Sequence, residues 1–149
     1  MTRGYDHVVA TIFTRIIIGE IPGTFVWRDD TCVAFMSINP IAPGHVLVVP
    51  IAEVDHWVDL PVATNEHIMR VAHAIGTAQR SVIECERIGL IVAGYEVPHT
   101  HLHVIPTRNM ADVSFANAAT SVDRDELEAA ADRIRAELLR RGHQEAMRT

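Results

Sequence analysis

Three histidines stand at alternate positions in the segment Val97-Pro98-His99-Thr100-His101-Leu102-His103-Val104-Ile105-Pro106. Side chains of a β-strand point alternately to its two faces. An extended conformation would therefore place the three rings on one face, with neighbouring imidazoles about 6.5–7 Å apart. Pro98 disfavours helix in the residue before it, and Pro106 is expected to mark the far limit of regular pairing. The sequence predicts a strand with one histidine face and one face toward a core.

Three uses of such a histidine face are compatible with the residues alone. The rings could be the polar outer face of a half-buried strand, or they could bind a metal, since imidazole is the commonest protein ligand for zinc and similar ions. A metal site needs further ligands, and the segment 104–109 contains no carboxylate or cysteine. The third use is phosphate chemistry, in which one imidazole attacks phosphorus and another manages a proton. The spacing favours this third interpretation.

The run His99–Ile105 resembles the signature of the histidine triad (HIT) family, in which three alternating histidines precede apolar residues. Two further segments carry the likeness. Residues 11–17 with Glu20-Ile21-Pro22 resemble the opening helix and turn of the family, and residues 34–50 resemble its central hairpin. The likeness covers roughly residues 11–108. It points to the Hint-like branch, and the residues flanking the triad are similar to an actinobacterial variety.

The resemblance implies an α+β fold with an antiparallel sheet of about five strands, one long covering helix and an additional C-terminal helix. We expect one domain over residues 1–149, with the shared core at about 11–108 and an extension with a helix at about 109–142. The family also implies a homodimer. The function it implies is that of a nucleotide hydrolase or transferase. Such an enzyme acts at an α-phosphate through a nucleotidyl-histidine intermediate, on a nucleoside phosphoramidate or a dinucleoside polyphosphate.

Roles for individual residues follow from the same resemblance. His101 would be the nucleophile, with its other ring nitrogen held by a backbone carbonyl. His103 would contact the phosphate and the leaving group, and His99 and His45 would orient this network. A purine nucleotide substrate would be held by Ile12, Phe13, Ile16, Phe35, Ser37 and Ile38.

Three departures from the family concern substrate recognition. Ser37 stands where many relatives have an aspartate that binds the ribose hydroxyls. Tyr95-Glu96 replaces a Gln-Ser or Gln-Thr pair near the scissile phosphate, and a carboxylate there would repel a phosphate unless it points away or is protonated. Pro98 removes a backbone donor just before the triad. Without an arginine cluster here, the anion is expected to rely on imidazolium groups and backbone N–H donors.

The structural zinc of some relatives is expected to be absent, and no cofactor is expected. Thr11 and Thr14 stand where zinc-bearing relatives carry two cysteines, and Glu53 stands where they carry a further histidine. A hydroxyl is a poor zinc ligand beside a thiolate.

Two other functions remain open at this level. The chain could be a nucleotide-binding regulatory module with little turnover, or a metal-binding protein that uses its histidine cluster. Tight nucleotide binding without a covalent intermediate would favour the first, and metal in the purified protein would favour the second.

Composition limits the remaining possibilities. The net charge is −6, from 13 basic and 19 acidic residues, and no basic run could follow a polynucleotide backbone, so no nucleic-acid partner is expected. No apolar run approaches the roughly 20 residues of a membrane span, and the N-terminus lacks the apolar core of a signal peptide. We expect no membrane partner, a cytoplasmic location, and reduced thiols at Cys32 and Cys85.

Local patterns predict the positions of the helices and strands along the chain. We expect a short helix at Thr11–Ile18, strands at Gly23–Arg28 and Thr31–Met36 around an Asp29-Asp30 turn, a central strand at His45–Pro50, a long helix from Asn65 to about Glu84, a strand at Arg87–Ala93, an irregular segment at Asp112–Thr120, and a final helix from the capping box Asp123–Glu126 to near Gly142. His67 and His73, both on the long helix, are expected to be solvated. His45, judged alone, is more typical of a capping or solvent-facing histidine.

Overall fold

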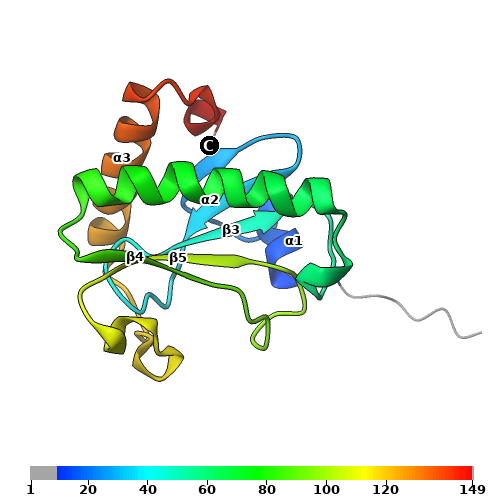
Figure 1. The fold of residues 1–149 in the computed structure, drawn as a ribbon, viewed down its shortest axis with the longest axis horizontal. Helices are drawn as coiled ribbons and strands as arrows, with labels where there is room; N and C mark the ends of the chain where they lie inside the picture. The colour runs from blue at the N-terminus through cyan, green and yellow to red at the C-terminus, as the bar shows by residue number, and fades with distance from the viewer. Residues whose placement is uncertain (1–9, 149) are drawn as a thin grey trace, which may run out of the picture.

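The computed structural model describes residues 10–148 and contains one five-stranded antiparallel sheet with helices packed on it (Figure 1). The strands are β1 (Phe25–Arg28), β2 (Cys32–Met36), β3 (Val46–Pro50), β4 (Arg87–Ile91) and β5 (Leu102–Thr107), in the spatial order β1-β2-β3-β5-β4. The helices are α1 (Ile12–Ile17), α2 (Val62–Val82) and α3 (Arg124–Arg140), with 3-10 turns at Trp57–Asp59, Met110–Val113, Phe115–Asn117 and Gln144–Arg148. The expected α+β architecture is confirmed.

The central strands are apolar on both faces because both faces of the sheet are covered. Val46 and Val48 of β3 pack in the core beneath α2, whereas Leu47 and Val49 pack with Phe13 of α1 on the opposite face. Period-two alternation in β2 divides its side chains between the same two cores. The central strand expected at His45–Pro50 is confirmed in the middle of the sheet, although it begins one residue later, at Val46. The α1 face is where the histidines project.

Helix α2 runs along one face of the sheet (Figure 1), and the residues it buries follow the helical period: Ile68, Val71, Ala72, Ile75, Ala78 and Gln79. It begins three residues earlier than expected, after Pro61, a residue well suited to a helix start. Gln79 is fully buried, and its amide nitrogen donates to the carbonyls of Gly44 and Val104 at 2.9 Å each. These bonds fix the loop before β3 and strand β5 to the helix.

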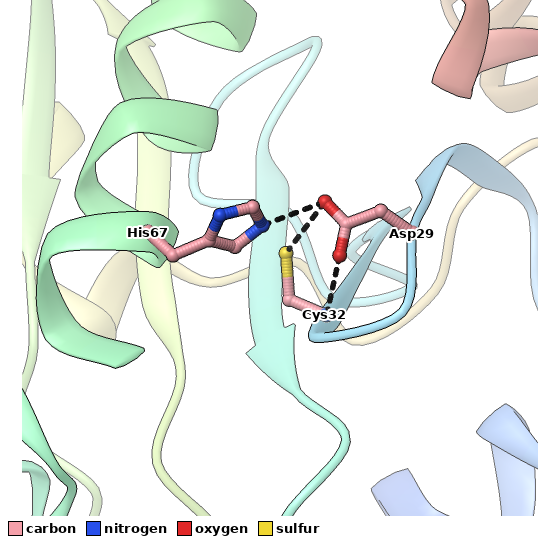
Figure 2. Close-up of side chains that lie close together, drawn as sticks. All are labelled: Asp29, Cys32 and His67. Atoms are coloured by element: carbon pink, nitrogen blue, oxygen red, sulfur yellow. Dashed lines mark hydrogen bonds and ion pairs between the residues drawn. The ribbon is translucent and has the colours of Figure 1, made fainter. Parts of the chain in front are cut away.

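A compact junction joins the β1–β2 turn to α2 (Figure 2). Oδ1 of Asp29 accepts the backbone N–H groups of Thr31 and Cys32, and its Oδ2 accepts the Trp27 indole N–H at 2.8 Å. His67 Nε2 lies 2.7 Å from the same Oδ2, so the expectation that this histidine is solvated was wrong. Burial would raise the pKa of Asp29, but these hydrogen bonds lower it below its ordinary value. These four donors fill the acceptor sites of the Asp29 carboxylate and hold the β1–β2 turn to α2.

Helix α3 packs on the domain itself. Asp123 caps its first turn by accepting from the N–H groups of Asp125 and Glu126, as the capping box predicts. Arg135 Nε donates to the carbonyl of Phe25 at 2.7 Å, and Thr24 Oγ1 donates to Glu128 at 2.7 Å. The C-terminal extension is thus tied to the edge of the sheet at β1.

Both cysteines have free thiols in the structure, with Cys32 buried and Cys85 partly exposed. Within residues 10–148, no helix combines the length and the apolar character needed to cross a bilayer. The N-terminal segment that we judged unlike a signal peptide lies outside the described residues.

Candidate active site

A cavity of about 340 Å³ opens on the sheet face that carries α1, and it collects most of the residues singled out from the sequence. All six residues expected to hold a nucleotide border it, together with three of the four histidines: Ile12, Phe13, Ile16, Phe35, Ser37, Ile38, His45, His101 and His103. Its volume falls in the range of small-molecule sites. The fourth histidine, His99, is fully buried beside the cavity rather than in its wall.

The triad is not one continuous strand, which corrects the sequence expectation. Strand β5 begins at Leu102, so only His103 of the three histidines lies in it, and His99 and His101 precede it. A tight turn in which the His99 N–H donates to the Val97 carbonyl at 2.8 Å bends the chain around Pro98. The ring centroids of His101 and His103 lie 4.7 Å apart, closer than an unbroken strand would hold them. The rings of His101 and His103 nevertheless meet on the same side of the sheet, where both border the cavity.

The pairing of β5 with β4 also continues to Thr107, one residue beyond the limit predicted at Pro106. Ile88 pairs with Pro106 and Arg87 with Thr107, whereas the last β5 partner of β3 is Val104. Pro106 lacks a backbone donor and is tolerated because only β4 accompanies the strand there.

Hydrogen bonds fix the tautomer of His101. Its Nδ1 lies 2.7 Å from the carbonyl oxygen of His99, and a carbonyl can only accept, so Nδ1 carries the proton. The lone pair is then on Nε2, as a nucleophile requires. The residue is only 1% exposed, and the ring of Phe13 packs against it edge-on at 4.8 Å. Access to Nε2 is therefore through the cavity.

A chain of hydrogen bonds gives His103 the opposite arrangement. The backbone N–H of Ile41 donates to His45 Nδ1 at 3.1 Å, so the proton of His45 is on Nε2, which lies 2.9 Å from His103 Nδ1. His103 Nδ1 must then accept, which leaves its N–H on Nε2. Within the described part of the chain, no group accepts from this buried Nε2. A donor without a partner beside a cavity is suited to an anionic oxygen.

Burial favours the neutral form of His45, His99 and His103. It lowers the pKa of His45 to about 3 and that of His103 to about 4, and it lowers the pKa of His99 as well. The expectation that imidazolium groups would hold the anion therefore does not fit His45 and His103 as the structure places them. The solvent-facing role that His45 suggested on its own was also wrong, since it is 2% exposed.

His99 lies in a hydrogen-bonded group with Thr11, Thr14 and Glu53. Its Nε2 donates to the Pro50 carbonyl at 2.7 Å, and its Nδ1 accepts from the Thr11 hydroxyl at 2.8 Å. Glu53 accepts from the Thr11 backbone N–H and the Thr14 hydroxyl. Two hydroxyls, one carboxylate and one imidazole are a poor donor set for zinc, and here they satisfy one another. These residues do not fit the structural zinc of some relatives.

Glu96 lies at the cavity and points toward the triad. Its Oε2 is 3.6 Å from Nε2 of His101, and its side chain is 43% exposed. The neighbouring Tyr95 is almost entirely exposed and is not in the cavity wall. Of the two possibilities raised by the sequence, the carboxylate does not point away.

Several residues of the cavity wall were not predicted from the sequence, and two of them, Phe115 and Arg124, lie in the C-terminal extension. Phe115 packs edge-on against the His103 ring at 4.8 Å, and Arg124 supplies a cationic group to the wall. The first lies in the segment read as irregular and the second was read as part of a helix cap. No local pattern signals that either would return to the triad. Ser37, by contrast, is in the wall as expected, and its hydroxyl oxygen accepts from the Asn39 N–H at 3.2 Å.

Comparison with known sequences gives a consistent family. A model of the HIT domain matches residues 18–110. An uncharacterized HIT-like protein of Synechococcus elongatus is 35% identical over 109 residues, which cover 68% of this chain and 93% of that protein. The Bacillus subtilis protein hit is 33% identical over 109 residues, covering 68% of this chain and 73% of its own.

Solved structures of histidine triad proteins have a similar fold. A zinc-bound histidine triad family protein of Mycobacterium smegmatis superposes with a TM-score of 0.75 at 26% identity, covering 88% of this chain and 94% of that one. A histidine triad nucleotide-binding protein of Candida albicans gives a TM-score of 0.62 at 25% identity, covering 88% and 99%. A HIT family hydrolase of Legionella pneumophila gives 0.56 at 29% identity, covering 68% and 96%.

Proposed function

The chain belongs to the HIT domain family, and from this membership and the geometry of its histidines we propose that it is a nucleotide hydrolase. It acts at an α-phosphate, and His101 carries the nucleotide in a covalent intermediate. The substrates are nucleoside phosphoramidates or dinucleoside polyphosphates. Relatives described as a nucleotide-binding protein and as a hydrolase support this assignment.

The observation that carries the proposal is the pair of opposite tautomers at the cavity. The bond to the His99 carbonyl puts a lone pair on Nε2 of His101, and the relay through His45 puts a proton on Nε2 of His103. A nucleophile and a hydrogen-bond donor thus border the same cavity. Displacement at phosphorus needs this combination, because negative charge grows on the phosphoryl oxygens and the leaving atom as the nucleophile attacks.

The reaction proceeds in two displacements. In the first, the Nε2 lone pair of His101 forms a bond to the α-phosphorus and the bond to the leaving group breaks. A leaving amine takes the bonding pair and one proton from solvent water, and departs neutral. In the second, a water oxygen bonds to phosphorus, the phosphorus–nitrogen pair returns to the imidazole, and one water proton is released to solvent, which balances the proton taken in the first step. His103 donates a hydrogen bond to the reacting phosphate in both steps.

The nucleoside lies on the apolar part of the wall. Ile12, Phe13 and Ile16 of α1 and Phe35 of β2 offer apolar surface for a purine base. The Ser37 hydroxyl is in reach of a ribose hydroxyl, with less electrostatic attraction than a carboxylate would give.

Turnover of adenosine phosphoramidate tests the proposal directly. Wild-type protein should release AMP, and the His101→Ala variant should not. His56→Ala, which changes an exposed histidine, is the matched control and should behave as wild type. Equal AMP release by wild type and His101→Ala would refute the proposal. Tight AMP binding by a wild-type protein that releases none would favour the regulatory module instead.

Metal binding at the triad is a second candidate with its own observation. Ligand atoms of Glu96, His101 and His103 all lie within 4.8 Å of one another, and the Mycobacterium smegmatis relative is described as zinc-bound. The measurement is the metal content of protein purified without added ions. Stoichiometric zinc in the wild type that is lost in His103→Ala would favour this candidate.

We propose that hydrogen bonds replace the structural zinc of some relatives at Thr11, Thr14, Glu53 and His99. The Thr14→Val variant should then lose stability in a chelator-treated buffer as much as in an untreated one. A destabilisation that appears only after chelation would contradict this.

We also propose a homodimer formed through β4. This strand ends the sheet order, its Leu90 is 43% exposed, and an apolar groove lined by Met69 and Ile88 runs between it and α2. Pairing of two β4 edges would continue the sheet across a two-fold axis. Light scattering should report a dimer for wild type and a monomer for Leu90→Lys.

A further inference from the structure

We propose that Asp29, Cys32 and His67 bind a zinc ion that holds the β1–β2 turn to α2 (Figure 2). The three side chains come from the turn after β1, the start of β2 and the first half of α2. Cys32 packs in the core beneath α2, whereas the histidine cavity lies on the α1 face, and the two sites share no residue. The inference is therefore independent of the proposed function.

The chemistry of the three ligands selects zinc. Thiolate, imidazole and carboxylate groups bind zinc in proteins, and three of them with one water complete a four-coordinate site. Calcium and magnesium prefer oxygen ligands alone, so the sulfur and the imidazole disfavour them. The charges also match, because one carboxylate and one thiolate together neutralise a divalent ion. Of the two clusters of three potential ligands within residues 10–148, only this one contains a sulfur atom.

The ligand atoms are spaced almost as a tetrahedral site requires, and all three lie within 4.8 Å of one another. With zinc about 2.0–2.1 Å from nitrogen and oxygen and about 2.3 Å from sulfur, neighbouring ligand atoms lie roughly 3.3–3.6 Å apart. Sγ of Cys32 lies 3.7 Å from Oδ2 of Asp29, close to this spacing. Nε2 of His67 lies 2.7 Å from the same oxygen because a proton lies between them, and this distance must widen by about 0.6 Å. The His67 ring is one-third exposed on α2 and has room to rotate outward.

Hydrogen bonds from neighbouring groups already hold Asp29 in the orientation of a metal ligand. Its Oδ1 accepts the backbone N–H groups of Thr31 and Cys32 at 2.8 Å each, and the Trp27 indole N–H donates to Oδ2 at 2.8 Å. Partners of this kind orient ligating carboxylates in metal sites. The carboxylate is thus ordered before an ion binds, which reduces the entropy that binding loses.

The Asp29 carboxylate also lacks a permanent cation beside it. Its side chain is 13% exposed, and its one ion-pair partner among the described residues is His67, which is charged only when protonated. A mostly buried carboxylate without an arginine or lysine partner is stabilised by a bound cation. Cys32 is fully buried, whereas Asp29 and His67 both reach the surface, so an ion and its water ligand can enter from their side.

Zinc replaces the two protons that the metal-free cluster holds between its ligands. The Cys32 thiol donates to Oδ2 of Asp29 in the structure, and this proton passes to solvent as the sulfur binds the ion. The Nε2 proton of His67 is replaced as well, and the neutral ring then carries its one proton on Nδ1. Because only the folded chain brings these ligands together, bound zinc raises the stability of the fold.

Cobalt is the probe for a sulfur ligand, because a thiolate–cobalt bond gives a charge-transfer band in the near ultraviolet that oxygen and nitrogen ligands do not give. Chelator-treated, full-length wild type titrated with Co²⁺ should show this band, and Zn²⁺ should displace it. The band should be absent in Cys32→Ser. In His67→Ala the zinc affinity should fall by more than the roughly 10–100-fold that loss of an outer hydrogen-bond partner causes. Added Zn²⁺ should raise the urea midpoint of wild type and leave that of His67→Ala unchanged.

Two variants are matched controls. Cys85→Ser removes the other, partly exposed thiol, and His103→Ala removes a potential ligand of the cluster at the triad. Both should keep the cobalt band and the zinc affinity of wild type.

A wild type without the charge-transfer band, or with a urea midpoint that zinc does not raise, would overturn the inference. A band lost in Cys85→Ser and kept in Cys32→Ser would also overturn it, because the thiolate ligand would then be Cys85. Zinc affinity kept in His67→Ala and lost in His103→Ala would place the ion at the triad, again against the inference. If circular dichroism shows that Cys32→Ser does not fold, His67→Ala decides, since its ring is one-third exposed. None of these measurements depends on turnover of adenosine phosphoramidate.

Discussion

Replacing His45 with phenylalanine tests the hydrogen-bond relay that fixes the tautomer of His103. Phenylalanine keeps a planar ring of similar shape but has no nitrogen. The variant removes the bond from the Ile41 N–H to His45 Nδ1 and the bond from His45 Nε2 to His103 Nδ1. Both bonds are buried, so two polar groups, the Ile41 N–H and His103 Nδ1, lose their partners.

The cost can be estimated from these two groups. Leaving a buried donor or acceptor unsatisfied costs about 1–3 kcal/mol each, so the free energy of unfolding should fall by about 2–6 kcal/mol. The rate should fall as well, because the His103 ring is no longer held with its Nε2–H toward the cavity. We expect kcat to decrease about 10–100-fold, which is less than the roughly 10²–10⁴-fold that loss of a positioned proton donor causes.

Urea unfolding gives the first quantity, and single-turnover release of AMP from adenosine phosphoramidate gives the second. His56→Phe is the matched control, because the same substitution is made at an exposed histidine outside the cavity. A His45→Phe variant that keeps wild-type stability and kcat within about twofold would refute the relay, since buried bonds of this kind are not lost without cost.

Three further predictions concern the same network and the junction at α2. His101→Ala should abolish formation of the covalent intermediate, whereas His103→Ala should slow turnover by about 10²–10⁴-fold; equal losses would show that the two roles are misassigned. Stability should be full above pH 6.5 and fall as the pH drops toward about 4, by up to about 1.4 kcal/mol per pH unit per histidine. In the unfolded chain these histidines take up protons near pH 6.5, whereas burial lowers the pKa of His45 to about 3 and of His103 to about 4 in the folded protein. Urea unfolding at about pH 7 and about pH 5 measures the loss of stability. An equal free energy of unfolding at the two pH values would contradict the prediction. His67→Ala should lower the free energy of unfolding by about 1 kcal/mol or less, because the bond to Asp29 is lost but the ring is one-third exposed; an unchanged urea midpoint would show that the junction does not hold α2.

Much of the fold could be predicted from local pattern. The run Val46–Pro50 is apolar on both faces, and the structure places it in the middle of a covered sheet. The helical period of residues 65–84 predicts α2, although the helix begins earlier, at Val62. The capping box predicts the start of α3 to the residue. In each case hydrophobic period or capping chemistry is local, so the sequence carries the signal.

The conformation of the triad could be predicted only in part. Alternation predicts that the three histidines project to one side, and the structure brings their rings together. It does not predict that β5 begins after His101. The N–H of Thr100 donates to the Val54 carbonyl instead of to β3, a contact between distant segments that no local pattern records.

The rest of the site depends on contacts between distant segments. We expected His45 at the start of a strand. Its hydrogen bond to His103 also requires β3 and β5 to pair in register. Phe115 and Arg124 join the cavity because the C-terminal extension folds back, which no local period records.

Whether His101 carries the nucleotide is tested most directly by mixing wild-type protein with adenosine phosphoramidate and quenching it rapidly in alkali, which spares the phosphorus–nitrogen bond that acid would hydrolyse, followed by mass spectrometry of the intact chain and of its peptides. We expect a transient adduct of one adenylyl group on His101, absent in His101→Ala. An adduct on another residue, or turnover without any adduct under conditions in which the first step is faster than the second, would contradict it.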